Sequence, residues 1–252
     1  MYKGFKISVV MPAYNEAAGV EQTVSAYRSL PEVDEVIVAD NNSSDDTKAL
    51  AERAGAVVVP EAKQGYGYAC RKALTSATGD FIFLVESDGT FRAPDLYKFL
   101  AYAPEFDAVF GTRTSKSCIW KGSNMGLFLR YGNCAVAKLL EYLHNGPCLT
   151  DVGCTCKIFR REALHAIAPR FTVGASHFSP ELMILAIRSG LRCVEIPVHY
   201  QPRLGQSRIT GSFRKAFFLG WKMIAMIILY RFKSVQRLTF GSDDKAQAGN
   251  GS

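Results

Sequence analysis

Short apolar runs alternate with amphipathic stretches through the first half of the chain. Runs that are short and rich in β-branched or aromatic residues are typical of buried parallel strands, and we expect strands over 7–11, 35–39, 56–59, 81–85 and 108–110. Helical spacing of apolar positions between them predicts helices over 16–28, 45–54, 66–77 and 95–101. This alternation predicts an α/β fold with a doubly wound, mostly parallel sheet, in which ligands bind at the carboxyl ends of the strands.

The second half of the chain predicts longer elements. We expect helices over 123–144 and 180–189, an extended segment over 151–159, a strand over 191–198 and a strongly apolar helix over 213–232. The Gly-, Asp- and Ser-rich residues from Gly241 onward are expected to be disordered. The expected organisation is one domain over 1–212, an apolar and basic helical segment over 213–240 and a tail over 241–252.

Composition favours a globular protein of a reducing compartment. A chain of 252 residues with 48% hydrophobic and 21% charged residues can bury a core without disulfides. Its seven cysteines form no C-x-x-C pair and its four histidines have no zinc-like spacing, so we expect reduced thiols. No signal-peptide pattern precedes the first predicted strand, which favours the cytoplasm.

The net charge of +7 is concentrated in one stretch. Eight basic residues and no acidic residue lie between Arg203 and Arg237. Such a block indicates phosphate groups nearby, on lipid, nucleotide or nucleic acid. Aromatic platforms for base stacking are not interleaved with the block, so we expect no nucleic-acid partner.

Polar residues stand at the ends of the first, second and fourth predicted strands. The first strand leads into Pro12-Ala13-Tyr14-Asn15-Glu16, and the second ends at Asp40, which can accept hydrogen bonds from a base or ribose. The fourth leads into Glu86-Ser87-Asp88, whose two carboxylates point the same way if the chain stays extended. Oxygen ligands of this kind suit hard divalent cations. Each motif alone also fits an ordinary turn, but their shared edge of the sheet favours one common ligand.

A series of motifs with a distinctive order runs along the chain. It consists of Val9–Glu16, Val38–Thr47, Lys63–Gly67, Glu86–Asp88, Asp151–Glu162 and Arg203–Ser207. Together they resemble the family 2 glycosyltransferases of GT-A fold, and within them the polyprenyl-phosphate (dolichyl-phosphate) sugar transferase branch. The resemblance covers residues 7–211.

The resemblance implies a nucleotide pocket built from the first two motifs and a basic loop. The pocket would be lined by Pro12, Tyr14 and Glu16. Asp40 would contact the base, and Lys63 and Gly65 correspond to a basic, glycine-containing loop near the nucleotide.

The resemblance also implies the catalytic groups. Glu86 and Asp88 would place Mg²⁺ or Mn²⁺ on the donor diphosphate, and Lys157 would face the acceptor phosphate. Arg203 and Ser207 match a loop that closes over the site.

Three positions depart from the family pattern. Glu86 stands where Asp is commoner, and Thr90 stands where the branch often has Gln, so both alter the metal site. Cys154-Thr155-Cys156 replaces Ser-Gly-Phe, which alters the shape offered to the acceptor.

The acceptor decides whether a catalytic base is needed. A phosphate is already an anion at neutral pH and needs only positioning, whereas a hydroxyl must lose its proton to a carboxylate within reach. Glu181 matches an acidic position of the family and is the candidate base. It is equally explained as an acid near a helix N-terminus, where the helix dipole stabilises it.

The helix expected over 213–232 is a candidate membrane contact. Lys215, Lys222 and Lys233 share one face, and much of the remaining circumference is apolar. A spanning helix needs roughly 20 apolar residues, and Lys222 interrupts a shorter run. We therefore expect a helix lying in the interface of an anionic membrane. Packing on the domain or on another subunit of a homo-oligomer is the alternative.

These expectations combine into a metal-dependent inverting glycosyltransferase at the cytoplasmic face of a membrane. It would move a sugar from a UDP- or GDP-sugar to a polyprenyl phosphate, with inversion implied by the resemblance alone. The alternatives are a soluble hydroxyl acceptor, a nucleotidyltransferase, whose glycine-rich phosphate loop is absent after the first strand, and a non-catalytic membrane scaffold on this fold.

Overall fold

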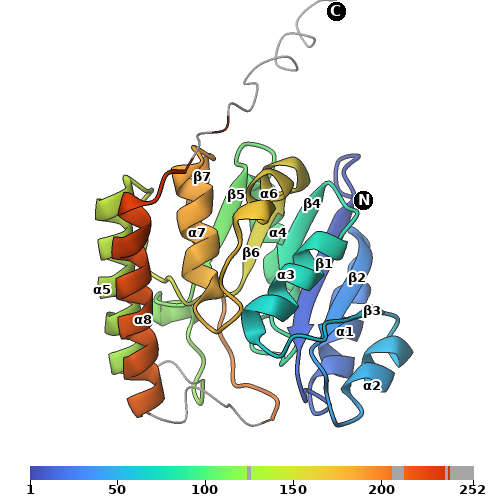
Figure 1. Cartoon of the computed structure of the whole chain (residues 1–252). Coiled ribbons are helices and arrows are strands. Elements are labelled where there is room, and N and C mark those ends of the chain that lie inside the picture. The colour runs from blue at the N-terminus through green and yellow to red at the C-terminus, as the bar shows by residue number, and fades with distance from the viewer. Residues whose placement is uncertain (124–125, 206–212, 236–237, 239–252) are drawn as a thin grey trace, which may run out of the picture.

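The computed structural model describes residues 1–123, 126–205, 213–235 and 238 (Figure 1). Its strands form one mixed sheet in the order β3-β2-β1-β4-β6-β5-β7. They are β1 (Ile7–Ala13), β2 (Val33–Asp40), β3 (Val57–Pro60), β4 (Phe81–Leu84), β5 (Ala108–Thr112), β6 (Lys157–Arg160) and β7 (Cys193–Pro197). Strand β6 is antiparallel to its neighbours β4 and β5, and the other pairings are parallel. The prediction of an α/β fold with a mostly parallel sheet is confirmed.

The helices cover the two faces of the sheet. They are α1 (Val20–Arg28), α2 (Thr47–Arg53), α3 (Tyr66–Ser76), α4 (Leu96–Tyr102), α5 (Leu127–His144), α6 (Arg161–Ile167), α7 (Phe178–Arg188) and α8 (Phe213–Phe232), with 3-10 turns η1 (Ala93–Asp95), η2 (Lys116–Cys118) and η3 (Ala168–Arg170). Two hydrophobic cores result, one beneath α1, α2 and α4 and the other beneath α3 and α5–α8. Val10 of β1 faces the second core while its neighbours Val9 and Met11 face the first, as the alternation of strand side chains requires.

The register of the parallel strands brings the predicted polar motifs together. Ala13 of β1 lies opposite Asp40 of β2, and Val10 of β1 lies opposite Leu84 of β4. The chain therefore leaves all three strands at the same edge of the sheet, where the residues after Ala13, Asp40 and Leu84 meet.

Helices α5 and α8 lie side by side at the outer edge of the molecule (Figure 1). His144 of α5 donates a hydrogen bond from Nε2 to the Ile227 carbonyl oxygen of α8 at 3.0 Å. The buried side chains of α8 are Met223, Met226, Ile227 and Tyr230, which join the second core. Within the described residues, no helix combines the length and the apolar character that crossing a bilayer requires.

Several boundaries differ from the sequence prediction. The first helix begins at Val20 rather than at residue 16, because Gly19, with a non-helical φ of −132°, separates it from the turn that precedes it. Of the segment expected to be extended over 151–159, only its end joins a strand, and α6 follows where no helix was predicted. The tail from residue 241 lies outside the described residues.

Candidate active site

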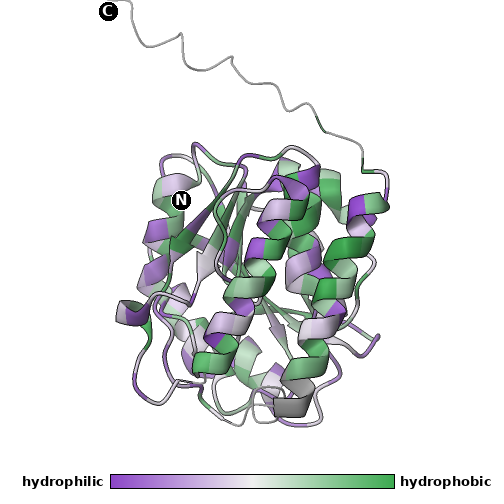
Figure 2. Cartoon of the chain, turned by 90° about the vertical axis from the view of Figure 1, so that its left-hand side faces the viewer, coloured by the Kyte–Doolittle hydropathy of each residue, from purple (hydrophilic) through white to green (hydrophobic). Residues whose placement is uncertain are grey.

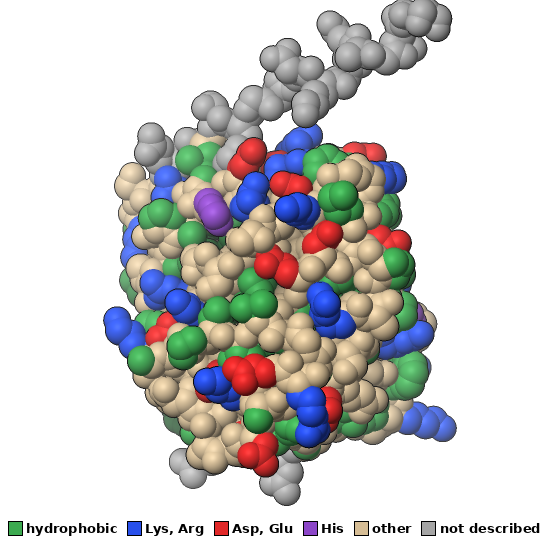
Figure 3. Space-filling view, turned by 90° about the vertical axis from the view of Figure 1, so that its right-hand side faces the viewer, with side chains coloured by type: hydrophobic (Ala, Val, Ile, Leu, Met, Phe, Trp, Pro, Cys, Tyr) green, Lys and Arg blue, Asp and Glu red, His purple; other side chains and the backbone are tan. Residues whose placement is uncertain are grey.

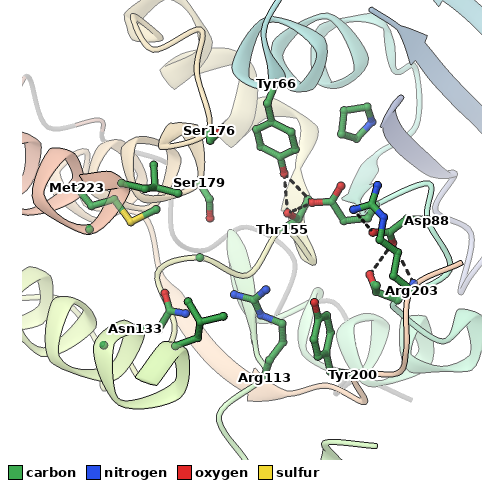
Figure 4. A pocket seen from close by; sticks show the side chains of 18 of the residues that line it. Tyr66, Asp88, Arg113, Asn133, Thr155, Ser176, Ser179, Tyr200, Arg203 and Met223 are labelled. Atoms are coloured by element: carbon green, nitrogen blue, oxygen red, sulfur yellow. Dashed lines mark hydrogen bonds and ion pairs between the residues drawn. The ribbon is translucent and has the colours of Figure 1, made fainter. Parts of the chain in front are cut away.

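A cavity of about 590 Å³ lies at the carboxyl ends of the strands and continues between α5 and α8 (Figure 4). Asp88 and Arg203 lie on one side of it, and Asn133 and Met223 lie on the other. The first side, which we call the donor end, is lined by Pro12, Ala13, Tyr14, Glu16, Asn41, Gln64, Glu86, Asp88 and Arg203. The second, which we call the acceptor end, is lined mainly by apolar residues of α5 and α8: Phe128, Leu129, Val136, Phe217, Leu219, Trp221, Met223 and Ile224.

The turn after β1 is fixed by the turn after β2. The backbone N–H of Asn15 donates to Ser43 Oγ at 3.0 Å, and that of Glu16 donates to Thr47 Oγ1 at 2.8 Å. Asn15 Oδ1 in return accepts from the Ser44 N–H at 2.8 Å. These bonds hold the cavity-lining residues of the first motif at the edge of the sheet.

Asn41 shapes the glycine-containing loop, a role that the sequence analysis missed. Its Oδ1 accepts from the Gly65 N–H at 2.7 Å, and its Nδ2 donates to the Lys63 carbonyl oxygen at 2.7 Å. Asn41 lines the cavity, whereas Asp40, Lys63 and Gly65 are not among the lining residues. Oδ1 of Asp40 is nevertheless a buried acceptor with no hydrogen-bond partner among the described residues.

Hydroxyl groups hold the two predicted metal ligands. Glu86 Oε1 accepts from Tyr66 Oη at 3.0 Å and from Thr155 Oγ1 at 2.5 Å. Asp88 Oδ1 accepts from the backbone N–H of Thr90 at 3.0 Å and from its Oγ1 at 2.6 Å. Burial, and then the nearby charge of Asp88, raise the pKa of Glu86.

Arg203 bridges the ends of β1 and β4. Its Nη1 lies 2.9 Å from Asp88 Oδ2, and its Nη2 contacts Glu16 Oε1. The next residue, Leu204, donates its N–H to the Asp88 carbonyl oxygen at 2.9 Å, which ties the loop to the end of β4. Burial raises the pKa of Glu16 to about 7, although Arg203 acts to lower it. Ser207, predicted to belong to the same loop, lies outside the described residues.

The carboxylates of Glu86 and Asp88 at the end of β4 are oxygen donors of the kind that a divalent cation takes, but they do not complete a site by themselves. Nowhere in the described ranges do three His, Cys, Asp or Glu side chains gather in a group that could hold a metal. Glu86 and Asp88 would therefore supply carboxylate oxygens, and phosphate oxygens and water would complete the shell, as is common for Mg²⁺. A cation that takes Asp88 Oδ2 must displace the Arg203 guanidinium from it.

Arg113 is a cavity residue that the sequence analysis missed. It follows β5, and Figure 4 shows its guanidinium pointing into the cavity between Asn133 and Tyr200. Its Nε and Nη2 bind the fully buried carboxylate of Asp151 at 2.8 and 2.9 Å. The guanidinium carbon lies 5.3 Å from the centre of the Tyr200 ring. A guanidinium held in place by a buried carboxylate thus lies between the donor and acceptor ends.

A known protein family matches more than half of the chain. The model of the family described as Glycosyl transferase family 2 matches residues 8–168. The chain belongs to this family. It is a nucleotide-sugar-dependent glycosyltransferase, as the motifs predicted.

The relatives agree with the family assignment, and the solved structures agree with the fold. An uncharacterized glycosyltransferase of Mycobacterium tuberculosis is 32% identical over 227 residues, which cover 88% of this chain and 99% of the relative. A dolichyl-phosphate hexose transferase of Haloferax volcanii is 28% identical over 204 residues, which cover 81% of this chain and 86% of that protein. The structure of M. tuberculosis glucosyl-3-phosphoglycerate synthase with Mn²⁺, UDP and phosphoglyceric acid has a TM-score of 0.68 and 22% identity, covering 91% of this chain and 79% of that one. The expected GT-A fold is confirmed.

The structure buries two residues of this glycosyltransferase for which a catalytic role was predicted, and the first is Lys157. We expected it to face the acceptor phosphate, but its side chain is fully buried and does not line the cavity. Its Nζ donates to Ser179 Oγ at 2.8 Å and to the Cys154 carbonyl oxygen. The reason is its place at the start of β6, where its side chain lies between the sheet and α7. Burial lowers the pKa of its ammonium group.

The second is Glu181, the candidate base. Its side chain is fully buried in the first turn of α7 and does not line the cavity. Both of its oxygens accept hydrogen bonds from protein groups: Thr172 N, Thr172 Oγ1, Val173 N and Tyr230 Oη. In this structure, protein groups therefore enclose the carboxylate away from the cavity.

Proposed function

We propose that this glycosyltransferase moves a hexose from a UDP- or GDP-sugar to a polyprenyl phosphate at the cytoplasmic face of a membrane. The observation that carries the proposal is the composition of the cavity along its length. Carboxylates lie at the donor end, the Arg113 guanidinium lies between the two ends, and apolar side chains line the acceptor end. A molecule with a phosphate head and a long apolar tail matches the last two of these regions.

The acidic side chains of the described lining residues all belong to the donor end of the cavity, away from the apolar end, which favours a phosphate acceptor. The acidic residues that line the cavity in this part of the chain are Glu16, Glu86 and Asp88, and no histidine lines it there. Glu16 and Asp88 are paired with Arg203, and Glu86 accepts two hydroxyl hydrogen bonds. A hydroxyl acceptor would need a general base, whereas a phosphate oxygen can attack without one.

Arg113 is the residue proposed to hold the acceptor phosphate. Arginine binds phosphate through a planar fork of donors, and Asp151 fixes the plane of this guanidinium. Asn133 of α5 lies beside it in the cavity and can donate a further hydrogen bond (Figure 4). The phosphate would thereby be positioned between the apolar end and the donor sugar.

The donor proposal rests on the polar motifs at the strand ends. Pro12, Tyr14 and Glu16 would contact the nucleotide, and the unpaired buried Oδ1 of Asp40 would face the base. Mg²⁺ or Mn²⁺ held by Glu86 and Asp88 would neutralise the diphosphate as it leaves. Arg203, released from Asp88, would add a second positive charge at that end, and the acceptor oxygen would attack the anomeric carbon from the opposite face, with inversion.

The membrane proposal rests on the outer surface of α5 and α8. Hydrophobic residues recur along both helices (Figure 2). The large exposed hydrophobic side chains of this surface are Leu127, Phe128, Tyr131, Tyr142, Phe217, Phe218, Trp221, Ile228, Leu229 and Phe232. The opposite side of the molecule instead mixes acidic and basic side chains, as is usual for a solvated face (Figure 3). We infer that α5 and α8 lie in the membrane interface, where the acceptor end opens towards the lipid.

Nucleoside diphosphate release is the direct test. The purified protein is incubated with UDP- and GDP-hexoses and Mn²⁺ or Mg²⁺, with and without a short-chain polyprenyl phosphate in detergent. We expect release to depend on both the cation and the polyprenyl phosphate, and the product to carry an inverted anomeric centre. Equal stimulation by the corresponding polyprenyl alcohol would contradict a phosphate acceptor. Equal stimulation by a short water-soluble alkyl phosphate would contradict the need for the apolar tail.

A further inference from the structure

Glu181 is a fully buried carboxylate that belongs to no ion pair with a described Lys, Arg or His. Its oxygens accept hydrogen bonds from neutral donors in two separate parts of the chain. Oε1 accepts from Thr172 N at 3.0 Å and from Thr172 Oγ1 at 2.5 Å, and Oε2 accepts from Val173 N at 3.0 Å. Oε1 also accepts from Tyr230 Oη of α8 at 2.5 Å. Burying a carboxylate is costly without such bonds, so its position depends on all of these donors.

The same bonds connect α8 to the segment 172–175. Tyr230 is 4% exposed, and its hydroxyl lies 3.1 Å from Thr172 Oγ1 as well as against Glu181. Movement of α8 at Tyr230 therefore disturbs the carboxylate that holds Thr172 and Val173. The next residue beyond this segment, Ser176, lines the cavity.

The segment 172–175 packs directly on the start of α3. The Gly67 N–H donates to the Gly174 carbonyl oxygen at 2.9 Å. A Cβ at Gly67 would lie 2.5 Å from the Val173 carbonyl oxygen, and one at Gly65 would overlap the Gly174 carbonyl oxygen. The two backbones are therefore in contact with no space for a side chain, and a shift of one displaces the other.

Tyr66 lies between Gly65 and Gly67 in the sequence, and its side chain reaches Glu86, the carboxylate proposed to bind the metal. Its hydroxyl donates to Glu86 Oε1 at 3.0 Å and lies 2.6 Å from Thr155 Oγ1. Figure 4 shows Tyr66 pointing towards Thr155 in the middle of the cavity. A continuous set of contacts thus runs from α8 through Glu181, the segment 172–175 and Tyr66 to Glu86.

We propose that Glu181 is a positioning residue that couples the seating of α8 to the placement of Glu86 at the donor end. The proposal deepens the function proposed above, since α8 lines the acceptor end and carries the membrane-facing side chains. When α8 is packed in place, Glu181 holds Thr172 and Val173. These residues hold the start of α3, and the start of α3 positions the Tyr66 hydroxyl on Glu86. The donor site would then be fully formed only when the helix of the acceptor end is in place.

The chain offers a matched pair of variants. Tyr230→Phe removes the hydroxyl that α8 presents to Glu181 and keeps the buried ring. His144→Asn loosens α8 at Ile227, one turn away, without touching Glu181 or the segment 172–175. Both variants weaken the attachment of α8, but only the first acts on the proposed connection. Thr172→Val tests the connection from the other side, and Glu181→Gln is added if it folds.

Hydrogen exchange measured by mass spectrometry tests the proposal without any ligand. We expect Tyr230→Phe and Thr172→Val to speed exchange in peptides covering 65–70 as well as 172–176, with Gly67 N–H as the reporter. His144→Asn should speed exchange in α8 and leave 65–70 unchanged. If Tyr230→Phe alters only α8 and 172–176, or if His144→Asn alters 65–70 equally, Glu181 merely stabilises the fold and the proposal is wrong.

Binding of UDP or GDP with Mn²⁺ supplies a second readout. We expect Tyr230→Phe to weaken it by about fivefold or more, the scale of a modest coupling between sites, and His144→Asn to leave it unchanged at a similar melting temperature. In a double-mutant cycle, Tyr230→Phe should weaken nucleotide binding much less in a protein that already carries Tyr66→Phe. If the effects of the two substitutions on the binding free energy are fully additive, the proposal is wrong. No acceptor is present, so failure of the polyprenyl phosphate proposal would be seen separately, in the release assay.

Discussion

The donor and acceptor ends of the cavity are built in different ways. At the donor end, short turns after β1, β2 and β4 are fastened to one another by hydrogen bonds and by the Arg203 bridge. At the acceptor end, the walls are side chains of α5 and α8, two helices far apart in the sequence and held mainly by packing. The first end is organised to fix charged groups, and the second offers an adaptable apolar surface. The difference suits an enzyme whose donor is compact and charged and whose proposed acceptor is long and apolar.

The largest expected effect comes from the donor end. Asp88 is only 3% exposed and pairs with Arg203, so Asp88→Asn is a cleaner change than removal of the whole side chain. We expect it to lower kcat on the order of 10²- to 10³-fold, the scale for removing one group that stabilises developing charge. The fold should survive, because Asn can still accept from Thr90. Glu21→Gln, which breaks an exposed pair with Arg53, is the control and should change neither kcat nor stability appreciably. Activity of Asp88→Asn close to that of the wild type would remove the proposed metal site.

The next effect tests the outer surface of α5 and α8. Phe218 and Leu229 are 61% and 63% exposed, so replacing both with Ser should cost little stability. Each apolar side chain withdrawn from a membrane loses roughly 1.5–3 kcal/mol, so binding to anionic vesicles should fall at least tenfold in a sedimentation assay. Tyr102→Ser on α4 is the control, since Tyr102 is 44% exposed elsewhere on the surface and should not matter. Deleting α8 is a poor test, because Met226 and Ile227 are buried in the core. Unchanged vesicle binding in the double variant would assign this surface to another partner.

The same contrast explains what the sequence could and could not predict. Pro12, Tyr14, Glu16, Glu86 and Asp88 line the cavity, and the sequence pointed to them because their motifs follow apolar strands and resemble those of the family. The apolar lining of α5 and α8 could not be distinguished from core positions, since both consist of the same residue types at helical spacing. Arg113 was missed because nothing beside it marks a site, and its partner Asp151 lies far along the chain. The burial of Lys157 and Glu181 could not be predicted, because a charged residue in a motif gives no sign of being buried.

Arg113 lies between the donor and acceptor ends of the cavity. A conservative substitution there distinguishes an effect on the acceptor from an effect on the donor. Arg113→Lys keeps the charge but loses the Nε and Nη2 donors that bind Asp151, and with them the fixed plane that directs the remaining N–H groups at the proposed acceptor phosphate. Loss of one hydrogen bond between charged groups predicts a rise of about tenfold in KM for polyprenyl phosphate. Steady-state kinetics should show little change in donor KM. A weakened donor with an unchanged acceptor KM would place Arg113 on the donor side. Arg113→Gln is less informative, since leaving the buried Asp151 unpaired costs roughly 3–5 kcal/mol of stability.

The smallest expected effect concerns the charge on the surface of α8. Lys222 is exposed among the apolar residues of that helix. A basic residue near an anionic membrane contributes about 1 kcal/mol, so Lys222→Gln should weaken vesicle binding roughly fivefold at low salt. The loss should shrink as ionic strength rises, because a surface charge is screened within about 10 Å at 0.1 M salt. Binding of the wild type should weaken with salt without vanishing, since the apolar contribution of Phe218 and Leu229 remains.

Lys48→Gln on α2 removes the same charge from an exposed site and is the matched control. If the two lysine variants lose binding equally, the attraction reflects only the net charge of the protein. A loss confined to Lys222→Gln would place α8 itself against the lipid headgroups.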